Sequence, residues 1–170
     1  VSFFKKKDII KIIIFLSMYR LAEAQLVKMN NPFFLDSREN GGLNLTTAQV
    51  GIAYGTVGLL CLTLGGLLGG MAAAKWGLKK CLWWMFLAIN IPDFSYVILS
   101  RYLPTNFGIV CGLVGAEALG YGFGYTAYML YMIYAAEGPH KTAHFAICTG
   151  FMALGMMIPG MFSVWIQSIV

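Results

Sequence analysis

The feature that most constrains the fold of this chain is the stretch from Thr47 to Ala73, which contains no charged residue. It is longer than the roughly 20 residues that an α-helix needs to cross the hydrocarbon core of a bilayer. Thr46 or Thr47 can cap its first turn, because a threonine side chain accepts a hydrogen bond from a free backbone N–H there. The stretch therefore predicts a membrane-spanning helix.

Four other apolar segments of similar length flank this one, and the longest polar interruption is a loop expected at about 30–46. The expected helices lie at about 9–29, 47–73, 78–101, 107–136 and 142–169. Only 11% of the residues are charged and 59% are hydrophobic, whereas soluble domains carry about 25% charged residues. We therefore expect an all-α integral membrane protein with five transmembrane helices.

The basic residues are distributed unequally when the chain crosses the membrane five times in alternation. Eight lysines fall on one side: Lys5, Lys6, Lys7, Lys11, Lys75, Lys79, Lys80 and Lys141. Three cations fall on the other side: Lys28, Arg38 and Arg101. Excess Lys and Arg mark the cytoplasmic side of a membrane protein. Because the lysines gather at helix ends and not along one face, the net charge of +5 does not indicate nucleic-acid binding.

Glycines four residues apart form a strip near the end of the uncharged stretch. The two pairs are Gly65 with Gly69 and Gly66 with Gly70. Residues four apart lie on one helix face, and small residues there let a neighbouring backbone approach closely. We expect this strip to pack against another membrane helix.

A short basic turn follows the strip. Lys75, Lys79 and Lys80 surround Gly77, which can adopt the positive-φ conformation that ends a helix. The set Gly70, Lys75, Gly77, Lys79 and Lys80 resembles the loop signature of the major facilitator superfamily, with Ala74 where that signature has an acid. In that superfamily the acid is expected in the first half and is often lost in the second, so the resemblance implies a second-half loop.

Other stretches are similar to the muropeptide permease and acetyl-CoA transporter branch of the same superfamily. They are Tyr19-Arg20-Leu-Ala-Glu23, Asn31-Pro32-Phe33, Gly51-Ile-Ala-Tyr54-Gly55 and Lys141-Thr142-Ala143-His144. The resemblance implies helices seven to eleven of a twelve-helix transporter, within a six-helix half-bundle whose twelfth helix and partner half lie outside this sequence. It also implies alternating-access transport of a small solute, with a cell-wall sugar-peptide as one substrate class, in a bacterial inner membrane.

Charged side chains near the middle of the first segment are candidates for function, since a charge at the bilayer centre costs at least about 2.5 kcal/mol. Arg20 and Glu23 are three residues apart and share a helix face beside Tyr19. Two interpretations remain: a salt bridge that fixes this helix, or binding of a substrate anion by Arg20.

Asn90 and Asp93 interrupt the third segment on either side of Pro92. Either they satisfy carbonyl groups that the proline leaves without a partner, or they serve the transported solute. In the fourth segment, Tyr121 and Tyr125, followed by Tyr128, have the spacing of a packing face. Tyrosine rings in a cavity can also stack on a sugar and hydrogen-bond to it.

Glu117 lies about eleven residues into the fourth segment, within the hydrocarbon. If Arg20 pairs with Glu23, Glu117 is left for another role, and burial favours its neutral form, so it can take up and release a proton during transport. If Arg20 pairs with Glu117, that acid is structural. We favour the first alternative.

No pattern indicates a cofactor or metal site. His140 and His144 lie four apart in an expected inner loop without a nearby third ligand, so we expect a solvated loop or a helix cap there and not a metal site. The cysteines stand singly. An intramembrane protease would need an aspartate pair or a Ser/His pair at membrane depth, and only Asp93 is an aspartate there, so an enzyme is disfavoured. A packing subunit of a larger membrane complex is the remaining alternative to a transporter whose partners are lipid, solute and proton.

Overall fold

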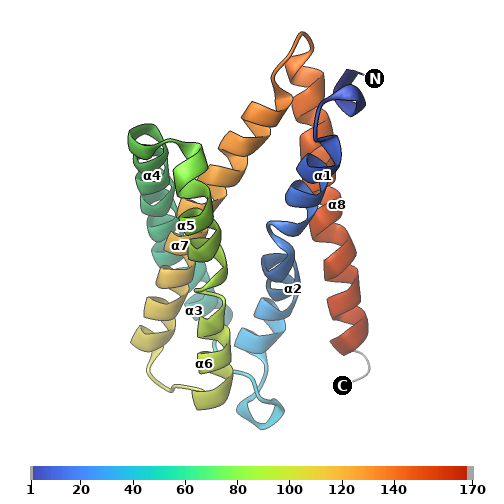
Figure 1. The fold of residues 1–170 in the computed structure, drawn as a ribbon. Coiled ribbons are helices and arrows are strands. Elements are labelled where there is room, and N and C mark those ends of the chain that lie inside the picture. The colour runs from blue at the N-terminus through green and yellow to red at the C-terminus, as the bar shows by residue number, and fades with distance from the viewer. Residues whose placement is uncertain (1, 168–170) are drawn as a thin grey trace. The chain divides into compact units, whose positions relative to one another are not determined.

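The structure is a computed structural model that describes residues 2–167, with side chains for 2–28, 30 and 32–162. Every regular element in the described part is a helix (Figure 1). In chain order they are η1 (Ser2–Lys5), α1 (Ile9–Met18), α2 (Leu21–Leu35), η2 (Arg38–Asn40), α3 (Thr47–Ile52), η3 (Ala53–Gly58), α4 (Leu59–Trp76), α5 (Leu78–Asn90), α6 (Phe94–Tyr102), α7 (Phe107–Ala136) and α8 (Lys141–Gln167).

Four helical stretches of the described residues are long and apolar enough to cross a membrane. They are Thr47–Trp76, Leu78–Tyr102, Phe107–Ala136 and Lys141–Phe162. The prediction of an all-α membrane protein is therefore confirmed, but the predicted count of five spans is wrong. The end of the fifth expected helix, at 168–169, lies outside the described residues.

The missing span is the first expected segment, which divides at Tyr19–Arg20 into α1 and α2. The residues around the break are polar, and neither half alone reaches the length of a spanning helix. Helix α2 also continues to Leu35 with Pro32 inside it, so the loop expected from residue 30 begins only at Asp36. Lys28 consequently lies within a helix and not at its end.

The chain divides into two compact units. Unit 1 contains Val1–Lys28 and Tyr128–Val170, and unit 2 contains Met29–Ala127. Helices α2 and α7 each contribute one part to unit 1 and the other part to unit 2.

In unit 1, α1 lies along α8 (Figure 1). The N-terminal segment is fixed to the stretch between α7 and α8, because Lys6 Nζ donates to the carbonyl oxygens of Ala135 at 2.5 Å and Glu137 at 2.6 Å. Ser2 Oγ and His144 Nε2 are 2.8 Å apart. Two stretches expected on the cytoplasmic side thus meet at one end of this unit.

In unit 2, α4 packs on α7 through glycines. A Cβ built on Gly69 would lie 2.8 Å from the Phe123 carbonyl oxygen, and one on Gly65 would meet the Leu119 carbonyl. From the other side, a Cβ on Gly122 would meet the Leu62 carbonyl. The expected close approach is confirmed for Gly65 and Gly69.

The strip is narrower than expected. A Cβ on Gly66 would be 4.0 Å from its nearest neighbours, and one on Gly70 would have nothing within 4 Å. Among the described residues, the expectation that Gly70 packs against a neighbouring helix is therefore wrong. Gly66 still contacts α7 through its backbone, because its carbonyl oxygen accepts from Thr126 Oγ1 at 3.3 Å.

A second glycine face of α7 packs on α5. A Cβ on Gly120 would meet the Ala88 carbonyl and lie 2.7 Å from Pro92 Cγ, and one on Gly124 would meet the Met85 carbonyl. Helix α7 therefore packs on α4 along one edge and on α5 along another, with close backbone contact at both. The glycines that alternate with aromatic residues from Gly120 to Tyr125 make both contacts possible, because Gly122 faces α4 while Gly120 and Gly124 face α5.

The two ends of unit 2 carry different loops. Gly77 is the single residue between α4 and α5, and its φ of 79° and ψ of 147° lie in a positive-φ region that only glycine adopts readily. At the other end, Arg38 donates to the carbonyls of Leu103 at 2.9 Å and Pro104 at 3.2 Å. The two stretches expected on the outer side are therefore joined to each other.

Candidate functional site

Four elements of unit 2 converge on a hydrogen-bonded cluster that contains Glu117. Tyr96 Oη, from α6, donates to Glu117 Oε2, from α7, at 3.0 Å. Tyr96 Oη is also 2.6 Å from Tyr54 Oη, which η3 provides. Asn30, from α2, donates through Nδ2 to Tyr96 Oη at 3.0 Å and to Tyr54 Oη at 3.3 Å. We call Asn30, Tyr54, Tyr96 and Glu117 the tyrosine–glutamate cluster.

Irregular backbone positions two of these side chains, Tyr54 and Tyr96. Tyr54 is the second residue of η3, a π-helical segment within the long span Thr47–Trp76. Such segments are uncommon and occur frequently at functional sites. Tyr96 follows the interruption at residues 91–93 between α5 and α6, where Pro92 cannot donate to the Ala88 carbonyl. Asn30 belongs to the part of α2 that extends beyond the expected helix end.

A pocket of about 270 Å³ adjoins the cluster. Its lining residues are Tyr54, Gly55, Gly58, Leu59, Leu62, Glu117, Ala118 and Tyr121. Most of its wall is apolar, while a carboxyl and two tyrosines supply polar groups. This is the usual composition of a small-molecule site. Glu117 and Tyr54 belong both to this pocket and to the cluster.

Tyr121 and Tyr125 lie one turn apart on α7 with their rings stacked, at a centroid distance of 5.4 Å and an interplanar angle of 19°. Tyr121 lines the pocket with Glu117. Tyr128, expected to continue the same face, belongs to unit 1 and is fully buried there. The structure thus joins Tyr121 and Tyr125 and gives Tyr128 a separate environment.

Unit 1 holds a second, buried polar group. Arg20 Nε donates to Glu23 Oε2 and Arg20 Nη2 to Glu23 Oε1, both at 2.7 Å. The residues are 7% and 9% exposed. Two parallel hydrogen bonds give a strong and directional pairing, because the guanidinium fork matches the carboxylate. The expected pairing of Arg20 with Glu23 is confirmed.

Tyr128 supports the break next to this ion pair. Its hydroxyl donates to the Leu16 carbonyl at 2.7 Å, in the last turn of α1, where carbonyl groups lack partners within the helix. The rings of Tyr128 and Tyr19 are stacked at 5.1 Å. A buried carbonyl group at a helix break needs a hydrogen-bond partner of this kind.

Asn90 and Asp93 flank the interruption between α5 and α6. Asn90 Nδ2 donates to the Phe86 carbonyl at 2.8 Å. The carbonyl that Pro92 leaves free is that of Ala88, so Asn90 satisfies a different group from the one expected. Asp93 is half-buried and directly precedes α6.

The residues of the basic turn lie where the sequence predicts a loop. Lys75, Lys79 and Lys80 are exposed around Gly77, and Lys75 Nζ lies 5.4 Å from the ring centroid of Trp76. Gly70 is also exposed.

The expectation of a solvated His144 is wrong. This residue lies in the first turn of α8 and is 1% exposed, because the N-terminal segment covers it through Ser2 and Phe3. His140 is exposed. Within the described residues, no group of three His, Cys, Asp or Glu side chains is arranged to hold a metal ion.

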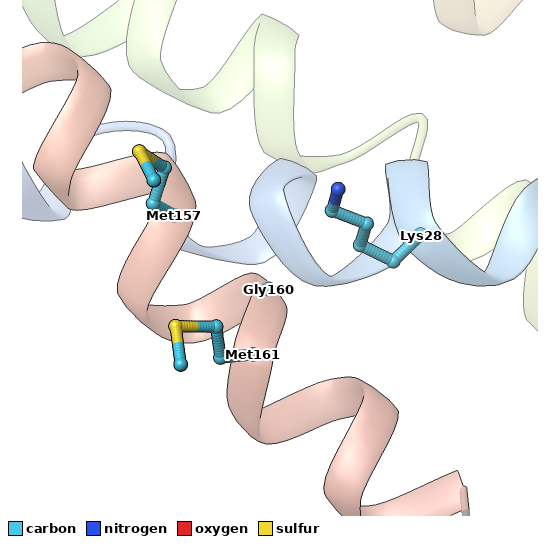
Figure 2. A pocket seen from close by; sticks show the side chains of 4 residues that line it. All are labelled: Lys28, Met157, Gly160 and Met161. Atoms are coloured by element: carbon cyan, nitrogen blue, oxygen red, sulfur yellow. The ribbon is translucent and has the colours of Figure 1, made fainter.

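Another pocket, of about 390 Å³, lies in unit 1 between Lys28 of α2 and three residues of α8, Met157, Gly160 and Met161. Figure 2 shows the Lys28 side chain extended beside α8. A Cβ built on Gly160 would be 3.3 Å from Lys28 Cε, so the glycine makes room for the lysine stem. Apart from this ammonium group, the lining is apolar and flexible.

Three cluster residues were not among the candidates from sequence. Asn30 appeared to belong to a loop, Tyr54 appeared only in a resembling stretch, and Tyr96 had no distinguishing pattern. Their spacing in the chain does not reveal that they meet. The only local sequence signal for this site is the pair of glycines around Tyr54, Gly51 and Gly55, because glycine constrains helical geometry least.

The fold defines an all-α integral membrane protein in which a pocket adjoins the tyrosine–glutamate cluster. The chain is similar to bacterial proteins whose names describe transporters. It is 36% identical to Putative transporter AmpG 3 of Rickettsia typhi over 74 residues, which cover 44% of this chain and 16% of that protein. It is 26% identical to Putative transporter AmpG 1 of Rickettsia bellii over 150 residues, 88% of this chain and 35% of that protein.

A third relative, Putative transporter AmpG 2 of Rickettsia prowazekii, is 24% identical over 166 residues, covering 95% of this chain and 38% of its own length. The chain thus spans well under half the length of these curated relatives. No family model matches the chain, and no solved structure matches it. Membrane transport in general is the activity that the relatives and the apolar helices support, and their names favour a transporter over an enzyme.

Proposed function

We propose that this chain is part of a major facilitator solute permease and supplies helices of its second half. The observation that carries the proposal is Glu117, an acidic side chain within a membrane span that lines a pocket together with two tyrosines. Intramembrane acids mark substrate, ion or proton pathways, because a charge there is costly unless it has a role. The resemblance of the Gly77 turn and the names of the relatives support the same proposal.

The transported solute is small and the protein works by alternating access in a bacterial inner membrane. A sugar-peptide fits the stacked pair Tyr121 and Tyr125, because an aromatic face can hold a sugar ring while the hydroxyl groups bond to it. Glu117 exchanges a proton during the cycle, whereas Arg20 and Glu23 form a structural ion pair.

Uptake into cells or liposomes containing the full-length protein tests the proposal. The screen should include amino sugars, sugar-peptides, free peptides and small anions, with vesicles lacking the protein as control. We expect saturable uptake of a sugar-containing solute driven by an inward proton gradient. If no solute in these classes is moved under any gradient, the permease proposal fails.

A second experiment tests whether the chain is only part of a transporter. Substrate sites of such permeases lie between two halves near the midplane of the membrane. Purified residues 1–170 in liposomes should therefore give no saturable transport. Saturable uptake by this piece alone would contradict the assignment to one half and favour a self-sufficient carrier.

A further inference from the structure

The order of hydrogen bonds in the tyrosine–glutamate cluster has a direction when Glu117 is ionised. A carboxylate only accepts hydrogen bonds, so Tyr96 must use its one hydroxyl proton to donate to Glu117 Oε2. The 2.6 Å contact between Tyr96 Oη and Tyr54 Oη then requires Tyr54 to be the donor. The Asn30 amide donates to both tyrosine oxygens, which is compatible with this order. The hydroxyl proton of Tyr54 therefore points toward Tyr96 Oη, in the direction of Glu117.

Protonation of Glu117 on Oε2 reverses this order. The neutral carboxyl donates to Tyr96 Oη, which already accepts from Asn30, so Tyr96 turns its own proton toward Tyr54. Tyr54 Oη then accepts from both Tyr96 and Asn30, so the O–H bond of Tyr54 must point away from these two residues. Only O–H rotations occur: one proton is added to Glu117, and none moves between oxygens.

We propose that Tyr96 is a positioning residue that transmits the protonation state of Glu117 to the Tyr54 hydroxyl beside the pocket. With Glu117 ionised, Tyr54 offers the pocket an acceptor; with Glu117 protonated, it offers a donor. The solute-binding surface thus changes its hydrogen-bonding character with the proton, without movement of a helix. This inference rests on the proposed role of Glu117 and extends it to two residues on other elements.

The groups around Glu117 make this route direct. Tyr54 faces it from η3 and Tyr96 from α6, while α4 contributes the apolar residues Leu59 and Leu62 to the shared pocket. On α7 itself, Tyr121 lines the same pocket.

Infrared titration of the full-length protein in liposomes tests the inference with the proton as the only probe. The carbonyl-stretch band of protonated carboxyls that disappears in Glu117→Gln reports the protonation of Glu117. The free energy of a hydrogen bond to a charged group corresponds to a change of about one to two units in the pKa of that group. Tyr96→Phe should therefore raise the midpoint of this band by about one pH unit or more, because the ionised form loses its donor.

Two further variants test whether the shift in the midpoint depends on the position of the tyrosine in the cluster. Tyr54→Phe acts one hydrogen bond further away, so it should raise the midpoint by a smaller amount. Tyr102→Phe is the matched control, since this tyrosine lies on the same helix as Tyr96 but is 77% exposed; it should cause no shift. An unchanged midpoint in Tyr96→Phe, or a larger shift in Tyr54→Phe, overturns the proposal.

Should Tyr96→Phe fail to fold, Tyr54→Phe carries the test, and the absence of a shift there also overturns the inference. The titration needs no transport, so its failure is separate from that of the proposed function. If Glu117→Gln stops proton-driven accumulation while Tyr96→Phe leaves the midpoint unchanged, only the positioning role is lost. If Glu117→Gln accumulates solute normally, the proton-coupling role proposed for Glu117 fails whatever the titration gives, while the permease proposal stands.

Discussion

The two units of this molecule each contain an acidic side chain held by hydrogen bonds, and its partners differ between them. In unit 1, Glu23 is bound by two charged hydrogen bonds from Arg20, in a site where both residues are buried. In unit 2, Glu117 accepts a hydrogen bond from the neutral hydroxyl of Tyr96 and borders a pocket. The first arrangement fixes a carboxylate charge, whereas the second lets the charge change, since a hydroxyl can both donate and accept.

The helices around these acids pack differently in part. In unit 1, Tyr128 bonds to the Leu16 carbonyl and stacks on Tyr19 at the break between α1 and α2. A glycine contact is also present there, because a Cβ on Gly155 of α8 would lie 2.7 Å from the Ser17 carbonyl oxygen of α1. Unit 2 relies on glycine, with Gly69 against α7 and Gly124 against α5. Polar groups that stabilise a broken helix and small residues that bring continuous helices together are two solutions for holding helices in lipid.

The largest expected effect on stability concerns the buried ion pair. Glu23→Ala removes the carboxylate that Arg20 holds and leaves the guanidinium buried without it, which should cost about 3–5 kcal/mol of folding free energy. Thermal unfolding of the purified full-length protein measures this. Glu39→Ala is the control, because Glu39 is exposed in η2. Equal melting temperatures for the two variants would contradict a structural role for the pair.

A smaller loss is expected from Gly69→Leu. Its side chain would collide with the Phe123 carbonyl and with Thr126, whose Cβ would lie 3.0 Å from the added Cβ. Overpacking of this kind costs about 1–3 kcal/mol. Gly70→Leu provides an adjacent control, since a Cβ there meets nothing within 4 Å. The ratio of folded to aggregated protein in size-exclusion chromatography should fall only for Gly69→Leu, and a similar fall in both would refute one-sided packing.

Tyr128→Phe should have a still smaller effect. It removes one hydroxyl and leaves the ring stacked on Tyr19, so it costs about 1 kcal/mol for the lost bond to the Leu16 carbonyl. Tyr134→Phe, on the same helix but 66% exposed, should be neutral. Chemical denaturation of both variants distinguishes them. A neutral Tyr128→Phe would mean that the break needs no support from α7.

The last and least perturbing variants test the orientation of unit 2 in the membrane. Glu39 and Lys79 lie on either side of the span Thr47–Trp76. In a background without the four native cysteines, Lys79→Cys should resist an impermeant thiol reagent added to intact cells, whereas Glu39→Cys should react. Activity should not change, because both side chains are exposed. Labelling of Lys79→Cys from outside would reverse the assigned topology.

These features differ in how far the sequence alone predicts them. Long uncharged runs and glycines at helical spacing predict the spans and the Gly65–Gly69 contact, because both depend on local periodicity. The pairing of Arg20 with Glu23 is also local, three residues apart on one helix. The sequence therefore predicts the polar site of unit 1 well, except for the break in its first helix.

The site of unit 2 depends on residues that are distant in the chain. Asn30, Tyr54, Tyr96 and Glu117 come from four elements, and no periodicity links them. The π-helical turn at Tyr54 and the extension of α2 to Leu35 are decided by packing with other elements, which sequence patterns do not express. The burial of His144 cannot be predicted from local sequence for the same reason, since Ser2, which contacts it, lies 142 residues earlier in the chain.

The most direct test of the account is proton-driven accumulation by Glu117→Gln in the full-length protein, using the solute that the uptake screen identifies. Glutamine keeps the size and the hydrogen bonding of the side chain but cannot exchange a proton. Glu137→Gln, exposed between α7 and α8, is the matched control. The account predicts that Glu117→Gln loses accumulation and retains downhill exchange, while Glu137→Gln keeps both. Full accumulation by Glu117→Gln would contradict the claim that this carboxyl carries the proton.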